Sequence, residues 1–191
     1  KNVRLTLTHG KKRLYTELGE MLFTHFGLSG PLVLSASSYM AGLDFSQCAL
    51  TLDLKPGLPP QQLEERILRD VAAAGKKRVQ TILRGLYPER LADVMATLCQ
   101  IDPSKPANEL KREEREALVH LTKALPLPVD GTEPMAAAVV TAGGADVREF
   151  SPATLQSKLI AGLYAAGEVL DVDALTGGFN LHIAFATGYC A

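Results

Sequence analysis

The stretch Gly162-Leu163-Tyr164-Ala165-Ala166-Gly167-Glu168-Val169-Leu170-Asp171, followed by Thr176-Gly177-Gly178-Phe179-Asn180, decides how the fold is interpreted. A short apolar run ends in Gly-Glu, an acidic loop follows, and two adjacent glycines open a new apolar segment. This order predicts a strand, a loop and the N-terminus of a helix. Glycines let a ligand approach the backbone, and the free N–H groups of a first helical turn attract anionic or polar groups.

Glu168, which closes the predicted strand, is placed to accept hydrogen bonds from the hydroxyl groups of a sugar or polyol, as in dinucleotide sites. A plainer interpretation fits the same residues. Two glycines before a helix are common in ordinary turns, and a glutamate after a strand is usually solvated. The residue types alone leave both interpretations open.

The chain has 191 residues, 47% of them apolar, and a formal net charge of −1. It is long enough for one large domain or two small ones with a substantial core. The near-neutral charge offers no electrostatic footprint for nucleic acid or for an anionic membrane, so we expect neither as a partner. No apolar run reaches the roughly 20 residues that span a bilayer, and no signal-peptide pattern is present, so we expect a cytoplasmic protein.

Cysteine and histidine spacing predicts neither a disulfide framework nor a metal site. The three cysteines are far apart and outside any CxxC pattern, so they are expected to be small apolar fillers. The four histidines show no spacing typical of metal ligands. These residues are Cys48, Cys99, Cys190, His9, His25, His120 and His182.

Residues 1–57 are expected to form a β-rich subdomain. Val3, Leu5 and Leu7 alternate with polar residues, which is typical of a half-buried strand ending at a glycine turn. After the strands, Ser29 is expected to cap a short helix that has Pro31 in its first turn. The expected elements are strands at 13–17, 21–26 and 49–54 and a helix at 32–40.

Residues 58–128 are expected to form an inserted helical bundle between two proline-rich boundaries, at 56–60 and 125–128. Apolar residues at helical spacing predict four successive helices. They lie between Pro60 and Gly75, from Val79 to Tyr87, from Pro88 to about Leu98, and after Asn108.

Two charged runs lie in this block. Lys111 to Glu116 alternate in sign and are interpreted as a solvated helix face. Lys76-Lys77-Arg78 could be a phosphate or nucleic-acid patch, but we favour a basic helix end, where backbone carbonyls attract cations.

After the second boundary, residues 129–152 are expected to return to the β-rich subdomain through a hinge. The apolar run from Met135 ends at Thr141-Ala142-Gly143-Gly144, which a hairpin turn also explains. Residues 153–191 are expected to be a separate segment, with one helical turn at 154–159 before the strand at 163–166.

The order of these motifs, together with Gly19 to Pro31 and Gly162 to Asp173, resembles the BaiN/YhiN-like family of bacterial FAD-dependent oxidoreductases. The resemblance runs over essentially the whole chain and is weakest in the helical block. It implies a mixed α+β and α/β fold: a β-rich subdomain, an inserted helical bundle and a partial Rossmann-like FAD-binding segment. The chain would then be the insertion plus the returning C-terminal part of the FAD domain.

The resemblance also implies which residues contact FAD. Gly167 and Glu168 would follow the ribityl and phosphate portion, and the turn from Thr176 would present backbone N–H groups to the pyrimidine edge of the flavin. The residues near the isoalloxazine would be those where the insertion rejoins. The full set is Thr141, Gly143, Gly144, Gly167, Glu168, Thr176, Gly177, Gly178, Phe179, Asn180 and Leu181.

The family's G-x-G-x-x-G segment, which places the FAD pyrophosphate, does not occur in these residues. We therefore expect this chain alone to bind FAD weakly or not at all and to need the missing N-terminal FAD-domain portion. His182 stands where relatives more often carry an uncharged amide, and we expect it to have a local partner on the helix face. No catalytic acid or base is assigned.

Two functions remain open from the sequence. The parent protein is expected to be a flavoprotein oxidoreductase, possibly linked to NAD(P)H, that acts on a small organic substrate. Alternatively, the helical block is a structural or protein-interaction module, and the isolated chain has no activity.

Overall fold

The computed structural model describes residues 2–191 as two compact units, each considered by itself. One unit contains the chain up to Thr6, Thr16–Gly19 and Ala49–Pro128. The other contains Leu7–Tyr15, Glu20–Cys48 and Val129–Ala191. The division passes through the first two strands of the chain.

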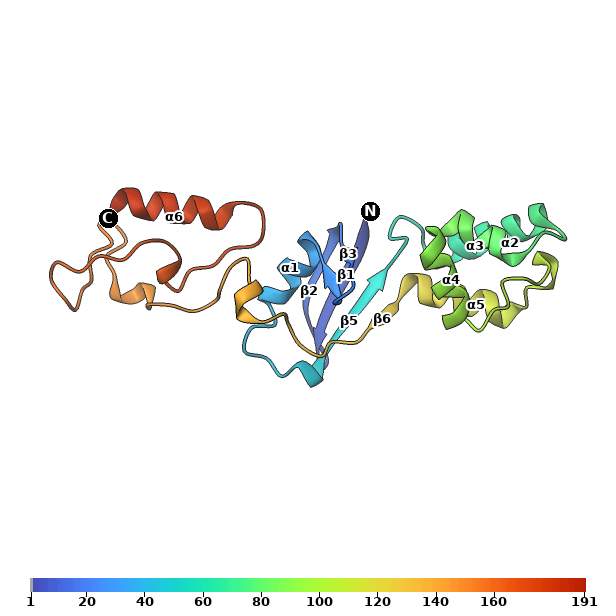
Figure 1. Ribbon diagram of the computed structural model, residues 1–191, viewed down its shortest axis with the longest axis horizontal. Coiled ribbons are helices and arrows are strands. Elements are labelled where there is room, and N and C mark those ends of the chain that lie inside the picture. The colour runs from blue at the N-terminus through green and yellow to red at the C-terminus, as the bar shows by residue number, and fades with distance from the viewer. Residues whose placement is uncertain (1) are drawn as a thin grey trace. The chain divides into compact units, whose positions relative to one another are not determined.

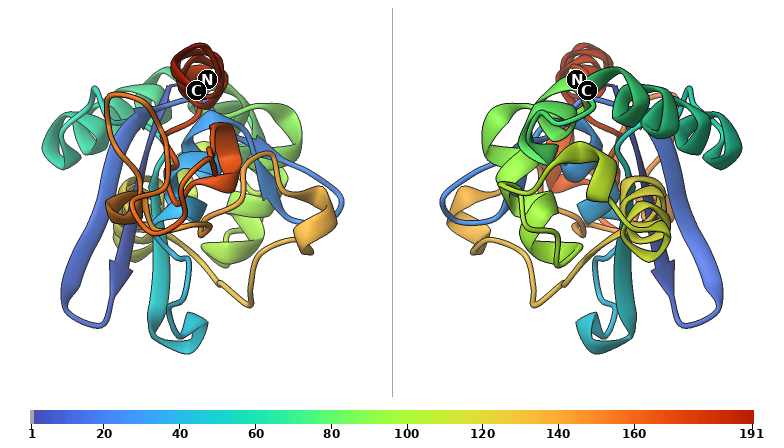
Figure 2. Two further views of the ribbon diagram at one scale, coloured as in Figure 1. Left: turned by 90° about the vertical axis from the view of Figure 1, so that its left-hand side faces the viewer. Right: turned by 90° about the vertical axis from the view of Figure 1, so that its right-hand side faces the viewer.

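The main sheet has four strands in the order β2-β1-β5-β6. They are β1 (Val3–His9), β2 (Lys12–Gly19), β5 (Cys48–Asp53) and β6 (Leu125–Leu127). Figure 2 shows the short connection from β1 to β2. Burial alternates along β1, where Val3, Leu5 and Leu7 lie in the core, so the predicted half-buried strand is confirmed.

The sequence interpretation took Leu125-Pro126-Leu127-Pro128 as a linker only, and this is wrong, because residues 125–127 form strand β6. The segment pairs antiparallel with β5, with Pro126 opposite Thr51. Proline cannot donate to a ladder, but β6 is the last strand in the order, where its missing N–H faces no neighbour. The edge position therefore explains how a proline-rich segment forms a strand.

The segment after β2 also differs in detail from the prediction. The strand expected at 21–26 is limited to β3 (Leu22–Phe23), which pairs antiparallel with β4 (Leu28–Ser29). Helix α1 (Pro31–Ser38) has Pro31 in its first turn as predicted, but its N-cap is Gly30, with no side-chain cap from Ser29. A Cβ on Gly30 would meet the Cα of Met21 at 3.0 Å, so the chain needs a glycine here.

The four predicted helices are present and pack together, as Figure 1 shows. Their buried side chains recur at the spacing read from the sequence, with Leu63 and Ile67 on the first helix fully buried. The helices are α2 (Pro60–Ala74), α3 (Val79–Leu86), α4 (Glu89–Leu98) and α5 (Arg112–Lys123).

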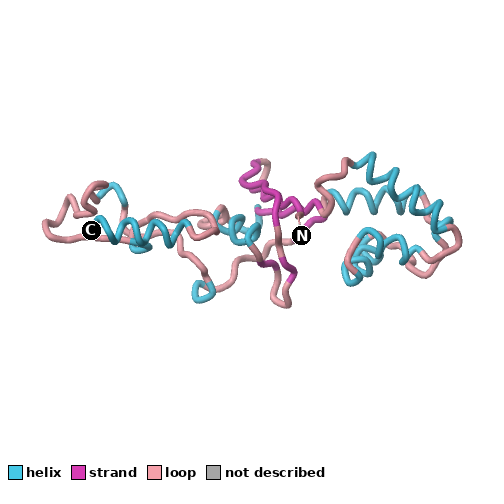
Figure 3. The backbone as a smooth tube through the Cα atoms, turned by 90° about the horizontal axis from the view of Figure 1, so that it is seen from above, coloured by secondary structure: helices cyan, strands magenta, loops and turns pink. Residues whose placement is uncertain are grey.

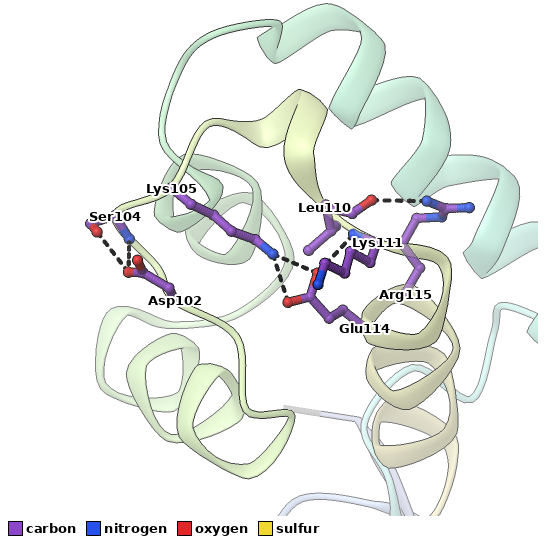
Figure 4. A network of polar contacts seen from close by, with 7 residues as sticks. All are labelled: Asp102, Ser104, Lys105, Leu110, Lys111, Glu114 and Arg115. Atoms are coloured by element: carbon purple, nitrogen blue, oxygen red, sulfur yellow. Dashed lines mark hydrogen bonds and ion pairs between the residues drawn. The ribbon is translucent and has the colours of Figure 1, made fainter.

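Helix α5 begins later than predicted, because Ala107–Glu109 form a separate 3-10 turn. Figure 4 shows how its start is held: Glu114 accepts hydrogen bonds from the Lys111 backbone N–H at 2.7 Å and from Lys105 Nζ at 2.6 Å. Burial opposes the charge of Glu114, but these bonds outweigh it and lower its pKa. The charged run from Lys111 to Glu116 is thus only partly a solvated helix face. Arg112 and Glu116 form an exposed ion pair at 2.7 Å, whereas the Glu114 side chain is largely covered.

The last residue of α5 bonds to the segment that leads from β5 into α2. Lys123 Nζ lies 2.7 Å from Asp53 Oδ2 and donates to the carbonyls of Lys55 and Leu58 at 2.8 Å. The Lys123 and Asp53 side chains are only 16% and 12% exposed. Leu54 N also donates to Thr122 O at 2.8 Å. The segment 53–58, which precedes α2, is therefore held by hydrogen bonds and an ion pair to the C-terminal end of α5.

Thr122 adds a buried link to the centre of the helices. Its hydroxyl bonds both the Tyr87 hydroxyl and the carbonyl of Leu118. Burial raises the pKa of Tyr87 to about 12, although the bond to Thr122 acts in the opposite direction. Because both hydroxyls are satisfied, this polar pair is compatible with an otherwise apolar core.

From β6 to residue 178 the chain contains mostly loops and short 3-10 turns (Figure 3). The predicted strand at 163–166 is wrong, since Tyr164 makes only an isolated bridge to Gln156. The predicted helical turn at 154–159 is also wrong, because Gln156 and Ser157 each make an isolated bridge there. A strand forms only beside a partner, and the described residues supply no continuous one.

Replacement of Lys123 by Met should lower the free energy of unfolding by about 2–4 kcal/mol, because it removes the ion-pair partner of the largely covered Asp53 carboxylate. Urea unfolding followed by circular dichroism measures this. Arg112→Met is the matched control and should cost much less, since its pair with Glu116 is exposed and screened by solvent. Equal losses in the two variants would contradict the role given to Lys123.

Glu114→Gln should destabilise the protein most at neutral pH. The folded-state pKa of Glu114 is lowered, so its contribution is present above the unfolded-state pKa of about 4.3 and is lost as pH falls through the folded value. The gap between the urea midpoints of wild type and variant should therefore close on acidification. A gap that stays constant on acidification would contradict this assignment.

Candidate cofactor site

Two of the glycine-rich segments predicted to contact a cofactor lie side by side. Ala145 forms a parallel bridge with Leu170, in which Ala145 N donates to Val169 O at 2.8 Å and Asp171 N donates to Ala145 O at 2.9 Å. The structure thus brings the segment 141–145 against the turn 167–171. These segments are more than 20 residues apart in the sequence.

Gly144 makes this contact possible. Its φ is +151°, and a Cβ there would lie 2.6 Å from Val169 O and 2.8 Å from the carbonyl carbon of Leu170. Any side chain would therefore push the two segments apart. This close approach of backbone to backbone is by itself a sufficient reason for a glycine at position 144.

Glu168 is held by the opposite segment. Its Oε1 accepts hydrogen bonds from the backbone N–H and the hydroxyl of Thr141, at 2.7 and 2.8 Å. The bond from the Thr141 N–H, followed by that from its hydroxyl, lowers the pKa of Glu168, so the group is a carboxylate at neutral pH. Both bonds use Oε1, which leaves Oε2 of this exposed side chain without a hydrogen-bond partner among the described residues.

The same turn packs against the last helix, α6 (Phe179–Cys190). Gly167 N donates to Thr187 Oγ1 at 2.8 Å, and this hydroxyl donates to Ile183 O at 2.7 Å. Thr187 is a residue that the sequence interpretation missed. A threonine inside an apolar helix usually bonds its own backbone, so no signal in the sequence shows the second bond.

The start of α6 carries the other predicted residues. Gly178 is its N-cap, in the left-handed conformation with φ of 84° and without a side-chain cap. His182 N bonds Gly178 O, whereas the N–H groups of Phe179, Asn180 and Leu181 come before the first intrahelical bond. These three donors and the positive end of the helix dipole make this turn suitable for a polar or anionic group.

The Asn180 side chain has a structural task at this turn. Its Oδ1 accepts from Ala174 N and its Nδ2 donates to Ala174 O, both at 2.8 Å. The acidic loop is thereby fixed to the first turn of α6. Thr176, Gly177 and Leu181 are exposed beside it, and so is His182, whose side chain forms no hydrogen bond with a described residue. The local partner expected for His182 is therefore absent from the described part of the chain.

Helix α6 exposes apolar side chains on the faces that do not pack against the turn Gly167–Val169. Phe185 is 76% and Tyr189 93% exposed, and Phe179 and Leu181 are also largely exposed. An apolar helix is normally buried on most of its surface. The exposed apolar surface of α6 is therefore unusual for an apolar helix.

Other features offer no alternative site. Within residues 2–191, no group of three His, Cys, Asp or Glu side chains is arranged to hold a metal ion, and no helix is long and apolar enough to cross a bilayer. Burial raises the pKa of the Cys99 thiol to about 11, which makes it a poor nucleophile at neutral pH. The shallow hollows on the helices contain none of the predicted residues.

Comparison with known proteins gives a family model and curated relatives. The model, described as "HI0933-like protein barrel and H2TH domain", matches residues 1–140. A 3-dehydro-bile acid delta(4,6)-reductase of Clostridium scindens is 34% identical over 95% of this chain. Ribosomal RNA dihydrouridine synthases of Haemophilus influenzae and Escherichia coli are each 34% identical over 90% of it. The chain spans 45% of the length of the first relative and 41% of each of the other two.

Replacement of Gly144 by Ala should separate the two glycine-rich segments. Hydrogen exchange at the amides of Ala145 and Asp171 should become at least about tenfold faster, because their acceptors move away. Gly143→Ala is the matched control, since Gly143 also has a positive φ but a Cβ there meets nothing within 4 Å. If both variants exchange at the same rate, the clash with Val169 O is not the cause.

Proposed function

Because the chain belongs to the HI0933-like family, the BaiN/YhiN-like family of flavoproteins, we propose that the complete protein is an FAD-dependent oxidoreductase that saturates a conjugated carbon–carbon double bond. NAD(P)H is proposed as the reductant. In this reaction NAD(P)H is oxidised to NAD(P)⁺, and the double bond takes up the equivalent of a hydride and a proton. The observation that carries the proposal is the cluster formed by Thr141–Ala145, Gly167–Asp171 and the start of α6.

The names of the relatives support one shared reaction. A delta(4,6)-reductase acts on carbon–carbon double bonds, and dihydrouridine is uridine with its 5,6 double bond saturated. Both a 3-dehydro steroid acid and a uracil ring carry a carbonyl group that can be conjugated with such a bond. We therefore propose a small conjugated ring as the reacting group, either free or as part of a larger molecule.

The residues of the cluster fit FAD by their chemistry. The N–H groups of Phe179, Asn180 and Leu181 would hold the pyrimidine edge, and the free Oε2 of Glu168 suits a hydroxyl of the ribityl chain or ribose. Thr141 positions Glu168 for this contact. Gly143, whose Cβ position is open, leaves room beside the same segment.

FAD would supply the redox chemistry, by passing a pair of electrons from the reductant to the substrate. The task of this chain is to bind and orient it. The positive end of α6 would stabilise negative charge at the pyrimidine edge without a titrating side chain. We assign no acid or base to this chain.

The exposed surface of α6 fits the same proposal. The chain covers less than half of its curated relatives, and the FAD-domain portion expected on the N-terminal side would bury Phe185 and Tyr189. Burial of such side chains contributes roughly 1.5–3 kcal/mol each. We propose that this portion is the partner that completes both the fold and the cofactor site.

An alternative role for residues 58–128 is a structural or protein-interaction module without a part in catalysis. The exposed Leu68, Val94 and Leu98 on α2 and α4 favour it. Removal of their side chains would then weaken assembly while leaving flavin reduction unchanged.

The proposal is tested by expressing the complete protein and recording its flavin absorption spectrum, then following bleaching by NADH and NADPH under anaerobic conditions. A yellow protein that either nucleotide bleaches is expected. Absence of flavin would refute the proposal, and flavin that neither nucleotide bleaches would remove NAD(P)H as reductant. The 191-residue chain by itself should bind FAD weakly, because it has no G-x-G-x-x-G segment.

Glu168→Gln in the complete protein should weaken FAD binding about tenfold, since an amide is a poorer acceptor for a hydroxyl than a carboxylate. Flavin fluorescence on titration of the apoprotein measures the change. Glu133→Gln is the control, because Glu133 is an exposed carboxylate with no described partner. Equal affinities for Glu168→Gln and wild type would exclude Glu168 from the cofactor site.

A further inference from the structure

The Asn180 side chain closes a loop of the chain just before α6. Its Oδ1 accepts a hydrogen bond from Ala174 N, and its Nδ2 donates to Ala174 O, both at 2.8 Å. An asparagine side chain carries a donor and an acceptor, so it can bond both backbone polar groups of one residue at the same time. Residues 175–179, which lie between these two residues, are called the Asn180 loop below.

The backbone N–H groups of residues 175–181 form an unbroken run of donors. None of them donates to an acceptor in the described part of the chain, and the first bond of α6 runs from His182 N to Gly178 O. All of these residues except Asn180 are exposed, so a ligand can reach them. The run is longer than the start of a helix alone provides, because it includes the Asn180 loop.

The Asn180 loop is held in its conformation by its own residues. Gly177 and Gly178 have φ of +135° and +84°, which glycine adopts more readily than any other residue. The Phe179 ring lies 3.3 Å from the position that a Cβ on Gly177 would take, so the ring packs against this glycine. The two bonds from Asn180 fix the other end of the loop.

Donors that are fixed in advance differ in their effect from donors on a loose loop. Fixed N–H dipoles stabilise a negative charge without a cost of reorganisation when that charge appears. Donors on a loose loop must first be ordered, and this ordering consumes part of the binding free energy. The bonds from Asn180 should therefore matter more for a negatively charged ligand than for a neutral one.

We propose that Asn180 is a positioning residue that raises the reduction potential of the flavin by fixing the Asn180 loop. This inference rests on the proposed function, in which the N–H groups at the start of α6 hold the pyrimidine edge. Uptake of two electrons and one proton by FAD leaves one negative charge at that edge, so fixed donors bind the reduced form more tightly than the oxidised form. By linkage, tighter binding of the reduced form makes reduction more favourable.

A merely structural role of Asn180 leads to a different result. If Asn180 only keeps the chain folded near α6, its removal weakens the binding of oxidised and reduced FAD by the same factor. The reduction potential of the bound flavin then stays unchanged, because it depends only on the ratio of the two affinities. The reduction potential therefore separates the two roles.

The test uses the complete protein with bound FAD. The variant Asn180→Ala removes both bonds to Ala174. Its midpoint potential is measured by anaerobic reductive titration against a reference dye, and its affinity for oxidised FAD is measured by flavin fluorescence. Asn108→Ala is the matched control, because the Asn108 side chain is exposed and forms no hydrogen bond with a described residue.

In Asn180→Ala the affinity for reduced FAD should fall about tenfold more than that for oxidised FAD, which corresponds to a potential about 30 mV lower for a two-electron couple. The control should keep the potential of the wild type. An unchanged potential in Asn180→Ala would overturn the inference, even if oxidised FAD bound more weakly. A complete protein without flavin would refute the proposed function and the inference with it, so the two failures are distinguishable.

Asn180→Ser keeps the inference testable if Asn180→Ala fails to retain FAD. Serine keeps a polar residue at the start of α6, but its single hydroxyl cannot replace both the amide oxygen and the amide nitrogen that bond Ala174. The potential of this variant should also be lower than that of the wild type. Hydrogen exchange at the Ala174 amide should become about tenfold faster in both variants. An unchanged exchange rate would show that Asn180 does not hold the loop and would overturn the inference.

Discussion

The Lys123 ammonium group is the contact on which the arrangement of the helical unit depends. It bonds the Asp53 carboxylate and the carbonyls of Lys55 and Leu58, and so fastens the exit from α5 to the end of β5. Residues 55–123 are a long excursion between two adjacent strands, and the Lys123 contacts, together with the bond from Leu54 N to Thr122 O, offset the entropic cost of bringing its ends together. The link also sets β6 beside β5, since α5 ends two residues before β6 begins.

A comparable constraint holds the candidate cofactor site, but here backbone atoms supply it. Gly144 permits contact with Val169 and Leu170 that no larger residue allows, and Thr141 then reaches Glu168. Thr187 ties the same turn to α6. The result is a polar cluster with a carboxylate oxygen and helix N–H groups left to bind a ligand, next to an apolar helix that remains uncovered.

These two constructions suggest a division of labour within the protein. The cluster around Glu168 is the part that we propose orients a cofactor, whereas the Lys123 contacts hold the helices to the end of β5.

The sequence by itself determined the features that depend on neighbours along the chain. Helical spacing in residues 60–123 and alternation in β1 predicted the helices and the first strand, and the glycines at 143–144, 167 and 177–178 marked the candidate site. Only the tertiary structure decided that Pro126 lies in an edge strand, that residues 163–166 form no strand, that Thr187 bonds Gly167 and that Lys123 bonds Asp53. Each of these features depends on a partner that is distant in the sequence. Local residue patterns do not show which distant backbone or side chain a residue will contact.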